Sequence, residues 1–218
     1  MESNWAAENL QTIRTLMERS AVYRRALAPV MIYVGVVGIV AAGAGWGLRI
    51  SDSGIFAIYW MAVSLVAIAG AFILVRRQTL KSAEPFWSPP TRRIAQAMLP
   101  ALVVGFIFGL LLAIKFFHID EGDDSPSAWV LIPIWTLLYG LALHAAGFFM
   151  PRGIRWFGWA FIFMGSALLV LIINGRLLAD QGVDIPPHLL MGVLFGLSHL
   201  AYGIYLYFTE PRKNESLS

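Results

Sequence analysis

The stretch ALAPVMIYVGVVGIVAAGAGWG, residues 26–47, contains no charged or amide side chain. The hydrocarbon core of a bilayer is about 30 Å thick. A helix rises about 1.5 Å per residue, so about 20 apolar residues are needed to cross that core. The stretch is therefore long enough and apolar enough to predict a transmembrane helix.

Further stretches of the same kind follow along the chain. They predict an all-α integral membrane protein with six transmembrane helices, at about 26–47, 54–75, 94–117, 128–150, 156–174 and 188–208. The composition agrees, since 58% of the 218 residues are hydrophobic and 13% are charged, whereas soluble domains carry about 25% charged residues. The mean hydropathy is +0.69. The absence of cysteine excludes disulfides and thiolate sites.

The segments outside these helices are short. Residues 1–25 predict an amphipathic helix at the cytoplasmic surface of the membrane or under the bundle, and a solvated cytoplasmic helix is the alternative. Residues 209–218 are expected to form a cytoplasmic tail. The connection 76–93 is expected to be irregular, because Pro89 and Pro90 disfavour a helix there.

The basic residues set the predicted orientation. Most of them fall in the N-terminal segment, the second and fourth connections and the tail, namely Arg14, Arg19, Arg24, Arg25, Arg76, Arg77, Lys81, Arg92, Arg93, Arg152, Arg155, Arg212 and Lys213. The opposite side is acidic, with Asp52, Asp120, Glu121, Asp123, Asp124, Asp180 and Asp184. Because cytoplasmic loops carry an excess of Lys and Arg, both termini are predicted to be cytoplasmic.

Similar stretches in several spans indicate an internal repeat. YRRALAPV and TRRIAQAML open the first and third spans, and YGLALHAAG and FGLSHLAYG lie in the fourth and sixth. These matches predict three repeated helical hairpins in one orientation. Apolar sequence of low complexity also produces such matches, so chance similarity is the alternative.

Two histidines lie inside predicted spans, His144 in 128–150 and His199 in 188–208. Polar side chains inside a bilayer normally face the bundle interior. Small residues near the histidines let neighbouring helices approach closely. The expected helix-packing residues are Gly105, Gly109, Gly140, Gly147, Gly192, Gly196 and Gly203. The spacing places His199 on one helix face with the last three of these. We expect a polar interior built by His144, His199, Tyr139 and Tyr202.

Three roles are open to the histidines. In the first, each imidazole forms interhelical hydrogen bonds that stabilise helix packing. Alternatively, the two are axial ligands of a haem, which glycine-lined helices would admit. In the third role they line a path for a solute or a proton. The spans contain no Asp or Glu, which disfavours a proton-driven pump.

The acidic connection HIDEGDDSPS, residues 118–127, is a candidate site for a divalent cation. Its ligands would be His118, Asp120, Glu121, Asp123 and Asp124, with His188 from the start of the sixth span. The spacing differs from that of an EF-hand loop, so a solvated acidic loop is the favoured interpretation. We therefore expect no resident metal.

No enzymatic motif is complete, and we expect no catalytic activity. GLSH, residues 196–199, begins like the nucleophile elbow of a hydrolase, but Leu200 replaces the last glycine. The fourth span contains no serine where rhomboid proteases carry theirs. The sequence has no phosphate-binding or dinucleotide-binding glycine motif. Nucleic-acid binding is not expected, because topology accounts for the basic residues.

LQTIRTLMERSAVYRR, residues 10–25, and HLAYG, residues 199–203, resemble segments of bacterial multi-pass integral membrane proteins that have no assigned function. The resemblance implies a bacterial inner membrane and assigns no site residue. The leading hypothesis is small-solute transport or ligand binding within the bundle. One alternative is a structural or regulatory component that docks a cytoplasmic protein through residues 1–25 and 76–93. The other is a bis-histidine haem protein.

Overall fold

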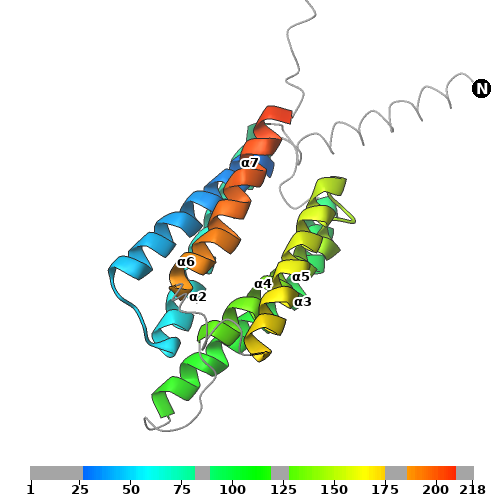
Figure 1. Ribbon diagram of the computed structural model, residues 1–218. Helices are drawn as coiled ribbons and strands as arrows, with labels where there is room; N and C mark the ends of the chain where they lie inside the picture. Colours follow the sequence, from blue (N-terminus) through cyan, green and yellow to red (C-terminus); the bar gives the residue numbers. More distant parts are fainter. Residues whose placement is uncertain (1–26, 82–88, 119–127, 175–185, 210–218) are drawn as a thin grey trace, which may run out of the picture.

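The computed structural model describes residues 27–81, 89–118, 128–174 and 186–209 (Figure 1). These residues form no strand, and six helices among them are long and apolar enough to cross a membrane. They are the first helix (Leu27–Gly47), α2 (Ser53–Lys81), α3 (Pro89–His118), α4 (Ala128–Ala146), α5 (Arg152–Ile173) and a last span, Pro187–Thr209. The last span consists of α6 (Pro187–Met191), a π-helix (Gly192–Leu197) and α7 (Ser198–Thr209). The predicted all-α class with six membrane-spanning helices is confirmed.

The expectation that 76–93 is irregular throughout is wrong. Helix α2 continues to Lys81, and α3 already begins at Pro89. Proline lacks the backbone N–H, but the N–H groups of the first helical turn have no partner within the helix. Pro89 can therefore begin a helix, although the same residue would weaken a helix interior.

The predicted fourth span is too long, and the predicted fifth span starts too late. Helix α4 ends at Ala146, and the Gly147 N–H donates to the Leu143 carbonyl at 2.9 Å in the turn that follows. Helix α5 then begins at Arg152. Residues 1–25 and 210–218 lie outside the described residues, so the N-terminal amphipathic helix and most of the tail stay predictions.

The first helix and the last span form a closely packed antiparallel pair, called the first/last pair below (Figure 1). A methyl group added at Gly38 would lie 2.8 Å from the Gly196 Cα, and one at Gly203 would lie 2.7 Å from the Ile32 nitrogen. Side-chain carbons do not approach backbone atoms so closely. Glycine at these positions therefore lets the two helices touch through their backbones.

Helices α4 and α5 form a second pair of the same kind, the α4/α5 pair. A methyl group at Gly140 would lie 2.7 Å from the Ile162 nitrogen, and one at Gly158 would lie 2.6 Å from the His144 nitrogen. Gly165 is equally close to the backbone of α4. Both pairs thus depend on glycine contacts rather than on large interlocking side chains.

Helix α2 is joined to the first helix, and α3 to α4, by hydrogen bonds from aromatic side chains to backbone carbonyls. The Tyr33 hydroxyl of the first helix donates to the Val66 carbonyl of α2 at 3.0 Å. The Trp135 indole N–H of α4 donates to the Gly105 carbonyl of α3 at 2.7 Å. Such bonds hold helices together in a bilayer, where hydrophobicity gives no preference for one helix over lipid.

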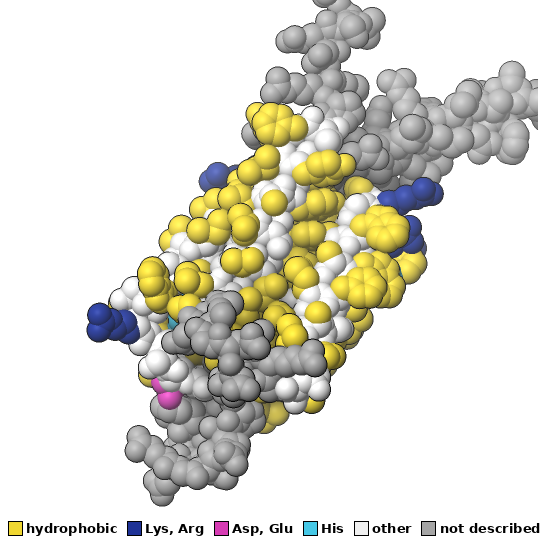
Figure 2. All heavy atoms as spheres, in the orientation of Figure 1, with side chains coloured by type: hydrophobic (Ala, Val, Ile, Leu, Met, Phe, Trp, Pro, Cys, Tyr) yellow, Lys and Arg dark blue, Asp and Glu magenta, His cyan; other side chains and the backbone are white. Residues whose placement is uncertain are grey.

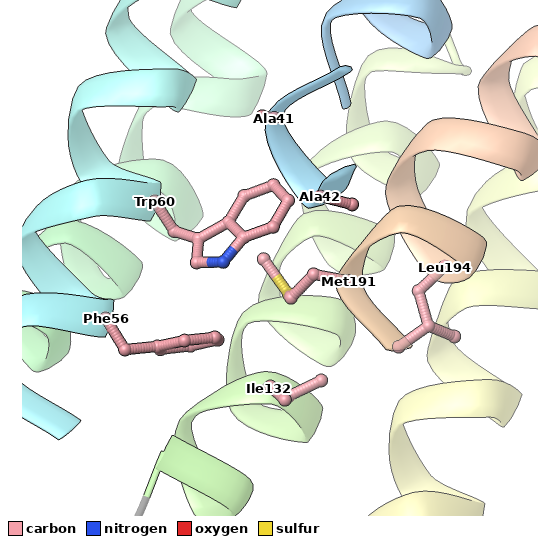
Figure 3. Packing of buried hydrophobic residues seen from close by; sticks show 7 residues of the cluster. All are labelled: Ala41, Ala42, Phe56, Trp60, Ile132, Met191 and Leu194. Carbon is pink, nitrogen blue, oxygen red and sulfur yellow. The ribbon is translucent and has the colours of Figure 1, made fainter. Parts of the chain in front are cut away.

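Helices α2, α4 and the last span meet at the end of the bundle where residues 48–52 connect the first helix to α2, called the 48–52 end below. Figure 3 shows their buried side chains pointing toward one another, together with two alanines of the first helix. The cluster consists of Phe56, Trp60, Ile132, Met191, Leu194, Ala41 and Ala42. At the opposite end a second cluster contains Leu27, Met31, Leu143, Ile154 and Phe161.

The sides of the bundle carry large apolar side chains, which Figure 2 shows spread over the visible face. Leu111 is 58% exposed, Phe163 is 66% exposed and Ile173 is 74% exposed. A soluble monomer rarely exposes such a continuous apolar surface, whereas lipid tails would cover it. The chain thus has the surface of a multi-pass membrane protein.

The predicted repeat of three hairpins is not tested by these contacts and stays a prediction. Gly140 and Gly196, which the repeat would make equivalent, both lie in a glycine-packed pair. Gly140 contacts α5, and Gly196 contacts the first helix.

Candidate functional site

His199 lies at the start of α7 and is fully buried, with 0% of its surface exposed. Its Nε2 atom is 2.7 Å from the Tyr139 hydroxyl of α4. Its Nδ1 atom is 2.6 Å from the Phe195 carbonyl, one turn earlier in the last span. Both ring nitrogens therefore have a hydrogen-bond partner within the bundle.

These partners determine the tautomer of His199. The Phe195 carbonyl can only accept, so the His199 Nδ1 carries the proton and donates it. The Nε2 atom of a neutral imidazole is then an acceptor, and the Tyr139 hydroxyl donates to it. The Tyr139 hydroxyl, the His199 imidazole and the Phe195 carbonyl thus form a chain of two hydrogen bonds between uncharged groups.

Aromatic rings of the α4/α5 pair enclose this imidazole. The rings of Phe157 and Phe161 in α5 lie 5.2 and 5.5 Å from it, centre to centre. The Tyr139 ring lies 5.3 Å away. Tyr202 stacks on Phe157 at 4.6 Å. The structure thus brings together three of the four predicted interior residues, His199, Tyr139 and Tyr202, with Tyr202 linked through Phe157.

His144, the fourth predicted interior residue, lies elsewhere, and its assignment to the same interior is wrong. Its ring contacts Phe148 at 5.4 Å and Trp159 at 5.1 Å. It follows Tyr139 by five positions, which turns the two side chains about 140° apart around α4. Its Nδ1 is buried and has no hydrogen-bond partner within the described part of the chain.

The π-helix directly before His199 is a feature that sequence reasoning missed. The backbone N–H of Ser198 reaches the Val193 carbonyl, five residues back, and the Ser198 hydroxyl reaches the same carbonyl at 3.3 Å. Isolated π-helical turns in α-helices are rare and occur frequently at functional sites. Here the turn contains Phe195, whose carbonyl accepts the hydrogen bond from His199.

The predicted glycine face is corrected in one respect. Gly192, Gly196 and Gly203 contact the first helix, whereas His199 contacts α4 and α5. All the predicted packing glycines lie at contacts with other residues: Gly105 and Gly109 at Trp135, Gly140 and Gly147 at α5, and Gly192, Gly196 and Gly203 at the first helix. The last span therefore lies between the first helix and the α4/α5 pair, with a different face toward each.

The residues present do not fit a bis-histidine haem. An axial ligand needs a free imidazole lone pair, but the Nε2 lone pair of His199 accepts the Tyr139 proton. Phenyl and phenol rings occupy the space around that imidazole. His144 and His199 contact different sets of rings.

His188, the one weak metal candidate whose side chain is described, is 2% exposed and forms hydrogen bonds to other parts of the chain. Its Nδ1 accepts from the Trp60 indole N–H at 3.1 Å. Its Nε2 lies 3.0 Å from the Ile50 carbonyl and therefore carries the proton. Asp120, Glu121, Asp123 and Asp124 lie outside the described residues, as does the side chain of His118. Within the described part of the chain no cluster of three His, Cys, Asp or Glu residues could hold a metal.

The role of Trp60 could not be read from the sequence. Nothing in the spacing of Trp60 and His188 predicts their hydrogen bond, because the contact depends on how α2 packs against a span 128 residues later. The local signal is weak, since tryptophans occur throughout membrane helices and most often near their ends.

Comparison with known protein families, curated proteins and solved structures gave no match for this chain.

Proposed function

We propose that the protein binds a small uncharged solute between the first/last pair and the α4/α5 pair and lets it cross the membrane, with Tyr139 and His199 as the polar contact. The hydrogen bond between these residues carries the proposal, since it joins the two pairs deep within membrane-spanning helices. A solute with one donor and one acceptor would insert by replacing this bond with two of its own.

The packing around the Tyr139–His199 hydrogen bond supports passage of a solute between the two helix pairs. Each pair is held internally by glycine-backbone contacts, so it can move as a unit. Between α5 and α7 the ring contacts of Phe157 with His199 and Tyr202 involve side chains, which can change rotamer without unfolding a helix. The boundary between the pairs is therefore the easier one to open.

The chemistry of the boundary supports an uncharged solute. The ring neighbours of His199 and its hydrogen-bond partners carry no formal charge. Transfer of an ion into such surroundings costs far more than transfer of a neutral hydrogen-bonding molecule. Urea and glycerol are suitable probes of this class.

The test is permeation into proteoliposomes, followed by stopped-flow light scattering after a urea or glycerol gradient is applied. Vesicles with the parent protein should equilibrate faster than protein-free vesicles. Tyr139→Phe and His199→Phe should abolish the increase, because each removes a polar partner and keeps an aromatic ring. Tyr205→Phe is the matched control, since Tyr205 is 60% exposed. Equal rates with and without protein for both solutes would contradict the proposal.

The proposed location is a bacterial inner membrane with both termini in the cytoplasm. Support comes from the exposed arginines Arg76, Arg77, Arg92, Arg93 and Arg152, which lie at the helix ends remote from the 48–52 end. Cytoplasmic membrane ends carry such an excess of basic side chains.

Docking of a cytoplasmic protein is the second candidate function, and the same exposed arginines favour it. Residues 1–25, which would contribute, lie outside the described residues. Deletion of residues 1–22 should abolish co-purification of a partner while the bundle remains monodisperse. Retention of every co-purified protein after that deletion would exclude the N-terminal segment as the docking site.

A further inference from the structure

His188 fastens the beginning of the last span to two other parts of the chain. Its imidazole accepts from the Trp60 indole of α2 at 3.1 Å and donates to the Ile50 carbonyl of the 48–52 connection at 3.0 Å. The Phe56 ring lies 4.9 Å from it, centre to centre. A methyl group at Gly45 of the first helix would lie 2.6 Å from the His188 Cε1. The imidazole thus fills a space formed by the first helix, α2 and their connection.

Next to His188, a layer of apolar side chains closes the bundle at the 48–52 end. Met191 and Leu194, one and two turns further along, pack with Phe56, Trp60 and Ile132 (Figure 3). Met191 is 4% exposed and Leu194 is 5% exposed. Access from the 48–52 end to the Tyr139–His199 pair requires this layer to open.

The π-helix lies between His188 and His199 in the last span. Eleven residues of uninterrupted α-helix would bring His188 and His199 to within about 20° of each other around the axis. Instead, His188 contacts α2 and His199 contacts α4 and α5. The extra residue of a π-helical turn changes the angular offset by about 100°. Conversion of Gly192–Leu197 to α-helix would therefore rotate Pro187–Met191 and withdraw His188 from Trp60.

We infer that Pro187–Met191 is a gate at the 48–52 end, held closed by the hydrogen bonds of His188 and turning at the π-helix. The inference rests on the proposed passage of a solute, for which the gate provides access to the Tyr139–His199 pair. Its movement is nevertheless measurable without any solute. Trp60 holds the gate closed, and Gly45 provides the space into which it closes.

The chain contains no cysteine, so a single introduced thiol reports on the gate without background. In Met191→Cys the thiol is buried when the gate is closed, and its reaction with a water-soluble maleimide measures opening. Trp60→Phe removes the indole donor and keeps an aromatic ring. We expect it to raise the labelling rate about fivefold, as the loss of one hydrogen bond shifts a two-state equilibrium. Tyr59→Phe is the matched control, because the Tyr59 hydroxyl donates to the Ala41 carbonyl and not to His188.

A second reporter separates gating from general loosening. Leu143→Cys lies in the cluster at the opposite end and is 3% exposed in the parent protein. Its labelling should not change in Trp60→Phe. Deletion of Val193, whose side chain is 54% exposed, removes the extra residue. An uninterrupted α-helix then keeps the observed angular offset between His188 and His199 and leaves no π-helical turn to convert, so labelling at Met191→Cys should fall below the parent rate while Trp60 is intact.

Two results would overturn the gate. One is an unchanged labelling rate at Met191→Cys in both Trp60→Phe and the Val193 deletion. The other is equal acceleration at both reporters, which would show that the whole bundle has loosened. Because labelling uses purified protein without solute, its result concerns the gate, whereas the permeation of urea or glycerol concerns the proposed function.

Discussion

Three hydrogen bonds from aromatic side chains to helix carbonyls share a local feature, in that a glycine follows each accepting residue by four positions. The accepting residue and the glycine are Val66 and Gly70, Gly105 and Gly109, and Ala41 and Gly45. The Cβ atom of a helical residue is tilted toward the N-terminus and partly covers the carbonyl of the preceding turn. Glycine leaves that carbonyl open, so its second lone pair can accept from a neighbouring helix.

Gly109→Ala tests this feature directly. The added methyl group would lie 2.8 Å from both the Trp135 Cζ2 and the Met61 Sδ. The indole must then move away from the Gly105 carbonyl, and we expect a loss of about 1–3 kcal/mol in the free energy of unfolding. Unfolding by SDS, followed by circular dichroism, measures it. Gly43→Ala is the control, because no atom lies within 4 Å of its added methyl group. Equal stability of the two variants would refute the explanation.

Tyr139→Phe tests the energetic value of the central hydrogen bond. The variant leaves the buried Nε2 of His199 without its donor, and we expect a loss of about 1 kcal/mol in the free energy of unfolding, as for other interhelical bonds in membranes. The double variant Tyr139→Phe/His199→Phe should lose less than the sum of the single variants, because neither partner is then left unpaired. Additive losses would mean that the two residues do not interact.

At the scale of helices, the spans could be predicted and the π-helix could not. Span positions follow from the length and hydrophobicity of each stretch, which the bilayer itself imposes. Their ends are less certain, as Pro89 shows by starting α3 where the sequence predicted an irregular segment. GVLFGL, the sequence of the π-helix, has the composition of any apolar helix. Its geometry depends on the distant partners of His188 and His199, which local sequence does not contain.

The end of the first helix holds Arg49 in a conformation that favours glycine. Its φ angle is 54°, and it lies at the turn where the Ile50 N–H donates to the Gly45 carbonyl at 3.2 Å. This is the left-handed position that follows many helices, and a side chain there costs about 1 kcal/mol relative to glycine. Arg49→Gly should therefore raise the free energy of unfolding by about 1 kcal/mol. Arg49→Ala removes the same charge but keeps a Cβ atom, so it should show no such gain. A larger gain in Arg49→Ala would attribute the effect to charge.

For the whole molecule, two glycine-packed pairs and two more peripheral helices form one bundle. Gly140, Gly196 and Gly203 are among the predicted packing glycines, whereas Gly38, Gly158 and Gly165 of the same pairs are not. The choice of partner helix could not be predicted, because one apolar helix face resembles another. The candidate site was only partly predictable for the same reason. Tyr139 and His199 meet, whereas His144 contacts Trp159 on another side of α4.

The orientation of this bundle is a property of the whole molecule and can be tested on the chain as it is. Ser51→Cys places a thiol at the 48–52 end, and Thr209→Cys places one at the end of the last span; both positions are exposed. With both termini in the cytoplasm, a membrane-impermeant maleimide should label Ser51→Cys in intact cells whose outer membrane has been permeabilised. It should label Thr209→Cys only after the inner membrane is opened. The reverse pattern would place the basic end of the bundle outside and refute the orientation, because the side that retains Arg and Lys fixes the topology of all spans together.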